Sequence, residues 1–171
     1  MPDGLRRLLS SAVWSAEAVR DELQSYVVEH FGEAEAVLVA DETGFLKQGQ
    51  HSAGVKRQYS GTAGRVANCQ IGVFLAYASS QGHVLLDAEL YLPHDWIDDA
   101  ARCVAAKIPP TVGVATQPAL ARQMIERTVA QGVPFRWITG DSIYGGDRTL
   151  RLWLEENRHW FVLAVTKAEP L

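Results

Sequence analysis

Apolar positions repeat with two different periods along the chain, and each period predicts a different kind of element. Within 5–12 and 19–30, apolar residues recur three and four positions apart, which predicts two amphipathic helices. Ser15 suits the N-cap of the second helix, and Gly32 follows its last turn. Because the helical pattern starts almost at the first residue, we expect 1–34 to be an N-terminal helical segment, the remnant of a larger helical domain.

Short apolar runs of strand length follow this segment. Two of them flank the turn sequence "SSQG", which predicts a hairpin. Helical spacing returns from about Thr116 to 131, where Gly132 ends the pattern, and from the N-cap residue Asp147 to about Asn157. The expected strands are 36–41, 69–78, 83–92, 135–141 and 160–166. A hairpin followed by strand–helix–strand units predicts an α/β chain with a mixed sheet flanked by helices.

Finer patterns predict which residues face the core. In the strand 83–92, alternation assigns Asp87 and Glu89 to a solvent face and Leu86 and Ala88 to the opposite face. The stretch 93–118 contains four prolines and predicts a loop. The inner face of the helix that begins near Thr116 is expected to carry Leu120, Met124, Ile125 and Val129.

The composition is that of a folded domain. A chain of 171 residues, 47% of them hydrophobic, can bury one sizeable core. No apolar run approaches the ~18 residues of a membrane span, and the N-terminal pattern is that of an amphipathic helix, not of a signal peptide. Cys69 and Cys103 stand apart and form no disulfide framework or zinc motif. We therefore expect a protein of the reducing cytoplasm that does not enter a membrane.

The distribution of charge singles out 44–68. The net charge of −4 argues against a general nucleic-acid binder, and 1–43 carries nine acids against three bases. The stretch 44–68, in contrast, contains no acid and five glycines, which favours a loop whose backbone can approach an anion. A solvated loop explains the same pattern from charge alone. The basic residues of this stretch are Lys47, Lys56, Arg57 and Arg65, with Tyr59 among them.

Two of the expected strands end on an acid, since "VLVAD" ends at Asp41 and "WITGD" ends at Asp141. If these strands are parallel neighbours, strand spacing puts the two carboxylates roughly 5 Å apart. Two anions so close repel each other unless one is protonated or a cation joins them, and carboxylate oxygens suit Mg²⁺ or Mn²⁺ better than zinc. A pair of this kind indicates metal-assisted phosphoryl transfer. Either aspartate alone would equally suit a turn cap at a strand end.

Other catalytic patterns fit the sequence poorly. It contains no phosphate loop, dinucleotide-binding turn, or Ser or Cys nucleophile motif, and its five histidines lack metal-ligand spacing. A phosphatase-like hydrolase with Asp41 as covalent nucleophile is a remote alternative. That chemistry needs an acid two residues after the nucleophile, where this sequence has Thr43, and a second aspartate closer to "GD" than Asp147.

Longer stretches resemble a known family. "VLVADETGFLKQG", "RQYSGTAGR" and "CQIGVFLAYAS" are similar, in this order, to the region around the first catalytic aspartate of bacterial insertion-sequence transposases of the DDE superfamily. "WITGDSIYG" resembles the region around their second catalytic aspartate, and the whole resemblance covers about 8–167. It implies an RNase H-like fold in which the strands that end at Asp41 and Asp141 are parallel neighbours. It also implies Mg²⁺-dependent cleavage and joining of DNA at transposon ends.

The resemblance implies roles for single residues as well. Asp41 matches the first catalytic aspartate and Asp141 the second, both as metal ligands. The basic residues of 44–68 would contact the DNA backbone, which gives affinity that falls with salt and depends little on sequence. Tyr59 could stack on an unpaired base, although packing within the protein explains it too.

The family's third carboxylate is a glutamate on a late helix, after the strand that matches 160–166. We therefore expect 35–171 to be a catalytic core truncated before that residue, and Glu155 and Glu156 to form only a solvated helix face. A chain of this kind would be inactive alone, would expose apolar surface near Trp160, and would self-associate or bind full-length transposase. A non-catalytic remnant that binds DNA or transposase is the alternative.

Overall fold

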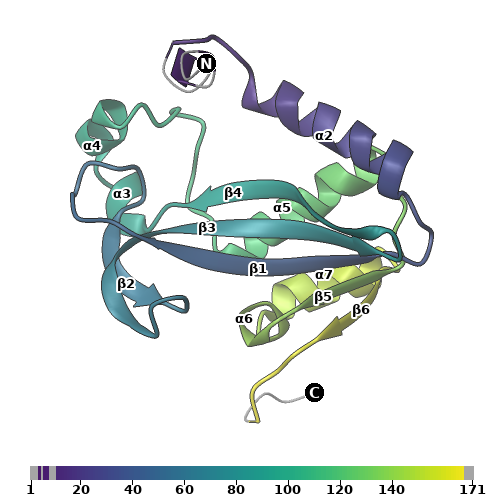
Figure 1. Cartoon of the computed structure of the whole chain (residues 1–171). Coiled ribbons are helices and arrows are strands. Elements are labelled where there is room, and N and C mark those ends of the chain that lie inside the picture. The colour runs from purple at the N-terminus through teal and green to yellow at the C-terminus, as the bar shows by residue number, and fades with distance from the viewer. Residues whose placement is uncertain (1–3, 5, 8–10, 168–171) are drawn as a thin grey trace.

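The computed structural model describes residues 4, 6, 7 and 11–167, so half of the residues of the helix predicted over 5–12 lie outside the described residues. Within the described part, six strands form one sheet with helices packed against it (Figure 1). The strands are β1 (Val37–Leu46), β2 (Lys56–Ser60), β3 (Arg65–Ser79), β4 (Gly82–Tyr91), β5 (Trp137–Gly140) and β6 (Trp160–Leu163). The helices are α2 (Ala16–Phe31), α3 (His94–Ile97), α4 (Ala100–Ala105), α5 (Gln117–Ala130), α6 (Ser142–Gly145) and α7 (Arg148–Glu156).

The sheet is mixed, as predicted. Its strand order is β2-β3-β1-β5-β6, and β4 pairs with β3 as the second arm of the predicted hairpin. β1 runs antiparallel to β3 and parallel to β5, while β6 lies parallel to β5 on the side away from β1. The α/β class and the parallel neighbours expected from the resemblance are confirmed, and the arrangement is consistent with an RNase H-like fold.

Side-chain caps position the helices where the sequence predicted them. The hydroxyls of Ser15 and Thr116 and the carboxylate of Asp147 each accept a hydrogen bond from the backbone N–H three residues later. Gly132 follows α5 with φ = 70°, a left-handed conformation that suits glycine. These local signals are short-range, which is why they can be recognised without the tertiary structure.

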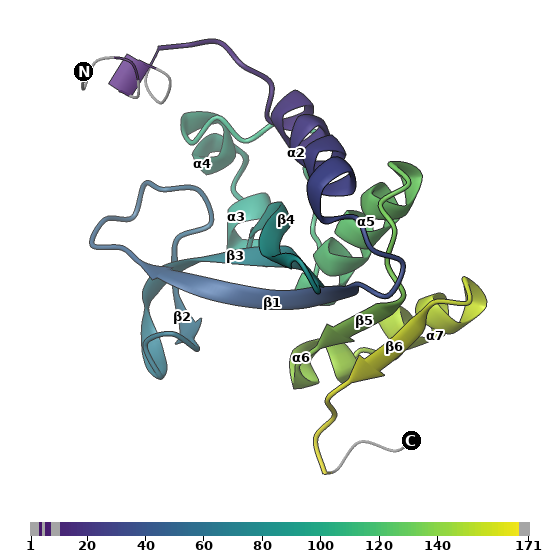
Figure 2. The same ribbon diagram turned by 45° about the vertical axis from the view of Figure 1, so that its right-hand side comes forward.

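The core lies between the sheet and α5 to α7 (Figures 1 and 2). Leu38 and Ala40 of β1 are buried there, with Ile138 of β5 beside them. On α5 the expected inner face is correct except at its end, where Thr128 is buried and Val129 is exposed. Thr128 is tolerated in the core because its hydroxyl donates to the carbonyl of Met124 one turn earlier.

The predicted alternation of the strand 83–92 is correct at Leu86, which is buried, but fails at Asp87 and Ala88. The register with β3 shifts between Leu75 and Ala76, which is a β-bulge, so Leu86 and Asp87 are both buried and Ala88 is exposed. The Asp87 carboxylate, 2% exposed, is neutralised by Arg127 of α5 at 2.9 Å. The bulge turns Asp87 toward the core, and the ion pair with Arg127 neutralises its charge there. Asp87 therefore lies on the face opposite to the one that a two-residue period assigns.

Three further regions differ from the prediction. The stretch 44–68, expected as one loop, contains the end of β1, all of β2 and the start of β3. The stretch 93–118 contains the short helices α3 and α4, in which Trp96 is fully buried and its indole N–H donates to the carbonyl of Val55. In α2, which falls in the range 19–30 of helical spacing, Gln24 is buried although it is polar, and the larger Tyr26 is half exposed. α2 packs mainly along β4 (Figure 2).

The face of β5 and β6 that points away from α5 to α7 is exposed, and we call it the open face. Trp160 and Val162 are about two-thirds exposed, as predicted for apolar surface near Trp160. Among the described residues, no helix is long and apolar enough to cross a membrane.

Candidate active site beside β1 and β5

The two sequence-predicted aspartates come directly after the paired segments of two neighbouring parallel strands. The strand expected to end at Asp41 continues to Leu46, so Asp41 lies within β1, just beyond its pairing with β5. The β1–β5 register runs to the pair Ala40 and Gly140; Asp41 is the next residue of β1, and Asp141 directly follows the last residue of β5. Adjacent strands are about 4.8 Å apart, so the fold brings together two acids that are a hundred residues apart in sequence. Ligands in open α/β sheets bind at this carboxyl end of parallel strands.

Each aspartate uses one oxygen locally and is exposed at the surface. Asp41 Oδ1 accepts a hydrogen bond from the backbone N–H of Glu42 at 2.8 Å, and Asp141 Oδ1 accepts one from the backbone N–H of Ile143 at 2.8 Å. Asp141 is thereby the N-cap of α6, as a turn-capping aspartate would be. These contacts leave Oδ2 of each carboxylate unused, so capping and ligand binding do not exclude each other.

Glu42 is a third acid at this site, which the sequence analysis did not single out. Its Oε2 accepts a hydrogen bond of 3.0 Å from the hydroxyl of Tyr144, whose side chain is fully buried. Burial raises the pKa of Glu42 above its ordinary value; the hydrogen bond opposes this shift, and the charges of Asp141 and Asp41 add to it. The three carboxyl groups therefore share one electrostatic environment.

The Tyr144 hydroxyl is held in its protonated form. Burial is the largest cause that raises the pKa of Tyr144, and the neighbouring charge of Glu42 is the next. The tyrosine consequently donates and Glu42 accepts. The only signal for this pair in the sequence is its placement, because Glu42 follows Asp41 and Tyr144 comes three residues after Asp141.

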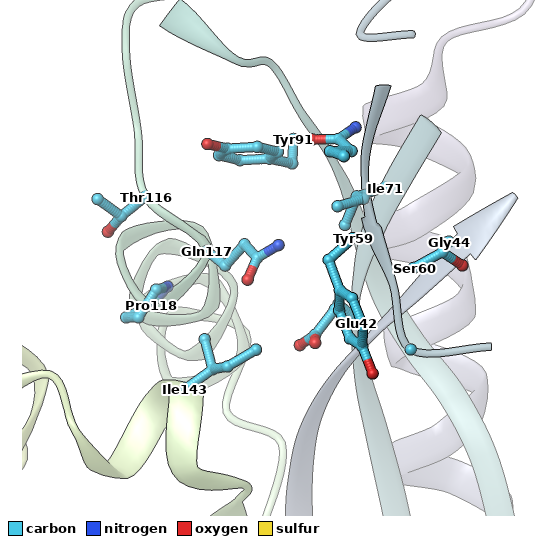
Figure 3. Close-up of a pocket in the computed structure, with 12 residues that line it drawn as sticks. Glu42, Gly44, Tyr59, Ser60, Ile71, Tyr91, Thr116, Gln117, Pro118 and Ile143 are labelled. Carbon is cyan, nitrogen blue, oxygen red and sulfur yellow. The ribbon is translucent and has the colours of Figure 1, made fainter. Parts of the chain in front are cut away.

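Beside the acids, a cavity of about 390 Å³ opens between the sheet and the start of α5 (Figure 3). Glu42 points into it from β1, Tyr59 faces it from β2, and Gln117 faces it from the first turn of α5. The remaining lining residues are Gly44, Gln58, Ser60, Gly61, Ile71, Tyr91, Thr116, Pro118 and Ile143. Asp41 lies outside this cavity and lines another one, of about 350 Å³, on the other face of β1, with Val39, Thr43 and Phe45.

The basic residues of 44–68 differ in exposure and in ion pairing. Arg57 of β2 and Arg65 at the start of β3 are exposed, and so is Tyr59 between them. Lys47 is half-buried just after β1. Lys56 forms an ion pair of 2.5 Å with Asp95, so part of its charge is already neutralised.

The loop 47–55 is fastened to the sheet by side chains of β3. The Asn68 amide donates to the carbonyls of Lys47 and Gly49, and the Gln70 amide donates to the carbonyl of Ala53. A loop held by side-chain hydrogen bonds presents its residues in a defined position, unlike the solvated loop that the charge pattern also allowed. No sequence signal pointed to these two amides.

Two carboxylates make a small ligand set for a metal. Within the described residues, no cluster of three or more His, Cys, Asp or Glu side chains is arranged to hold an ion. Asp41 and Asp141 nevertheless offer hard oxygen donors at one edge of the sheet, which is the chemistry that Mg²⁺ and Mn²⁺ prefer. Glu155 and Glu156 of α7 are exposed, as expected for a solvated helix face.

The sequence of the chain is similar to that of known proteins. The sequence model of the family described as "DDE superfamily endonuclease" matches residues 2–171. Over 142 residues, the chain is 25% identical to the "Probable transposase for insertion sequence element IS701" of Microchaete diplosiphon. This alignment covers 83% of the chain and 34% of the relative, so the chain spans about a third of that protein's length.

Proposed function

Because the chain belongs to the DDE superfamily endonuclease family, we propose that it is catalytic-core sequence of a DDE-type transposase, whose complete form cleaves and joins DNA strands at transposon ends. The observation that carries this proposal is the parallel β1–β5 register, after which Asp41 and Asp141 follow side by side. In this proposal 35–171 is catalytic-core sequence that carries Asp41 and Asp141, and 1–34 is the helical segment that precedes it. The proposed place of action is the cytoplasm.

Asp41 and Asp141 would hold a divalent cation, Mg²⁺ or Mn²⁺, through the carboxylate oxygens that their backbone contacts leave unused. Such an ion supplies charge neutralisation at a phosphate and activation of an attacking hydroxyl or water. The protein's own part is to orient the two carboxylates at the edge of the sheet. With only two of them, we expect weak binding.

The DNA contact in this proposal is the β2–β3 hairpin with the loop before it. Arg57 and Arg65 are exposed and would contact phosphates, and Lys47 and Lys56 would add charge at the edge of the contact. Because Lys56 is paired with Asp95, we expect it to contribute less than either arginine. Tyr59, 63% exposed, is available to stack on an unpaired base.

Metal binding tests the acid pair directly. We expect the wild-type chain to bind Mn²⁺ in a titration followed by electron paramagnetic resonance, and the Asp41→Asn and Asp141→Asn variants to lose most of that affinity. Glu155→Gln is the matched control, since it removes one exposed acid from α7 and should change nothing. Unchanged affinity in Asp41→Asn would refute the proposed site.

DNA binding tests the hairpin. Replacing Arg57 and Arg65 by glutamine should weaken binding to DNA of any sequence and lower the slope of log affinity against log salt by roughly 0.9 for each phosphate that the protein no longer neutralises. The Lys56→Gln variant should have a smaller effect. A salt slope that stays the same in the double arginine variant would show that DNA binds elsewhere.

We propose further that this chain alone does not cut DNA. In-line transfer with two ions needs both of them anchored about 4 Å apart, and the described residues supply no third ligand at the aspartates. The alternative role, binding DNA or a complete transposase without cleavage, follows from the same observation. Nicking of plasmid DNA by the pure chain with Mn²⁺, absent in Asp141→Ala, would overturn this proposal and show that two aspartates suffice.

A further inference from the structure

The short helix α6, which Asp141 caps, is held against the sheet on two sides by close backbone contacts. A Cβ atom on Gly140 would lie 3.1 Å from the Tyr144 ring, so this ring packs directly on the end of β5. A Cβ atom on Gly145 would collide with the carbonyl oxygen of Ala164, so the end of α6 lies against the chain that leaves β6. Neither contact involves β1, the strand that carries Asp41.

A hydrogen bond links α6 to β1. Tyr144 is fully buried in α6, and its hydroxyl donates to Glu42 Oε2 at 3.0 Å across 102 positions of sequence. Glu42 lies next to Asp41 in the chain, and Tyr144 lies in the helix whose N-cap is Asp141. The bond therefore joins the strand of one aspartate to the helix of the other.

We propose that Glu42 and Tyr144 are positioning residues, which hold the Asp141 carboxylate in place beside Asp41 and thereby set the affinity of the pair for a divalent cation. The effect on the cation rests on the function proposed above. Glu42 does not itself act as a ligand, because its carboxylate lies on the cavity side of β1 whereas Asp41 lines the opposite side. Partners of this kind, which contact ligand-bearing elements and not the ion, typically change metal affinity by about 10- to 100-fold when removed.

The Tyr144→Phe variant removes the hydroxyl without changing charge. We expect two results in the folded variant: a shifted amide proton resonance of Ile143, which reports the cap bond from Asp141, and Mn²⁺ affinity about 10-fold lower. Glu42→Ala removes the same hydrogen bond and should reproduce both results. It therefore provides the test if Tyr144→Phe fails to fold. Glu42→Gln keeps an oxygen acceptor for Tyr144 and should retain the wild-type Ile143 resonance and most of the affinity.

The outcomes separate the inference from the function. Wild-type Mn²⁺ affinity and an unmoved Ile143 resonance in Tyr144→Phe would overturn the positioning role. Equal losses in Glu42→Gln and Glu42→Ala would also overturn it, because charge and not the hydrogen bond would then be responsible. A shifted Ile143 resonance in Tyr144→Phe, with Mn²⁺ affinity that does not depend on Asp41, would support the positioning of Asp141 and refute the proposed metal site.

Discussion

The two faces of β1 give neighbouring residues opposite surroundings. Leu38 and Ala40 face α5 to α7 and are buried, and Glu42 continues this face with its hydrogen bond to Tyr144. Asp41 lies one residue earlier than Glu42 but on the other face, where it is exposed. The open face extends to β6, where Trp160 and Val162 are exposed.

On β1, residues that pack in the core therefore lie on one face, and Asp41, the proposed metal ligand, lies on the other. Apolar burial and paired charges lie on the covered face, so substitutions there should change the free energy of unfolding. The open face carries Asp41 and exposed apolar side chains that contribute little to folding, so substitutions there should change binding and association instead. Four predictions test this division.

The largest effect is expected at Arg127. Replacing it by alanine leaves the Asp87 carboxylate buried without its cation on the covered side of the sheet, which should lower the free energy of unfolding by about 3–5 kcal/mol. Glu126→Ala is the matched control on the same helix, because its exposed ion pair with Arg122 should be worth only about 0.3–0.5 kcal/mol. Urea denaturation measures both, and equal losses would contradict the division.

Leu38→Ala should lower the free energy of unfolding by about 2–5 kcal/mol. Leu38 is fully buried at the centre of the core, so its truncation removes apolar contacts and leaves a cavity. Thermal unfolding followed by circular dichroism gives the size of the loss. A loss below about 1 kcal/mol would mean that the covered face collapses around the smaller side chain.

A pH-dependent effect is expected at His159, which lies between the rings of Phe135 and Trp153. Burial lowers the pKa of His159 below its ordinary 6.5, so the unfolded chain takes up the proton at higher pH than the folded chain. Stability should therefore be lost as the pH falls from 7 through 6.5 toward the folded pKa. His159→Gln should lack this part of the loss, whereas the exposed His83→Gln should keep it.

The smallest effect on stability is expected on the open face. Val162→Thr and Trp160→Ser should each change the free energy of unfolding by no more than about 0.5 kcal/mol, because both side chains are mostly exposed. If the wild-type chain self-associates, as its exposed apolar surface suggests, the double variant should sediment as a smaller species. A large loss of stability would show that this face contributes to folding.

Local sequence determines most of the strands and helices around Asp41 and Asp141. The apolar runs that end at Asp41 and Asp141, the caps at Ser15, Thr116 and Asp147, and the hairpin turn all depend on residues within a few positions of one another. Their periodicity and turn chemistry predict the elements, and the order of the elements predicts the mixed sheet. The parallel β1–β5 pair follows from that order together with the family resemblance.

Other features were decided only by the tertiary structure. The burial of Asp87 depends on a bulge opposite β3 and on Arg127, forty positions later, so a strict two-residue period assigned it to the wrong face. The bond between Glu42 and Tyr144 joins residues 102 positions apart. A single sequence indicates the local preference for strand or helix. It does not show which distant polar groups contact each other, because these contacts depend on the register and packing of the folded elements.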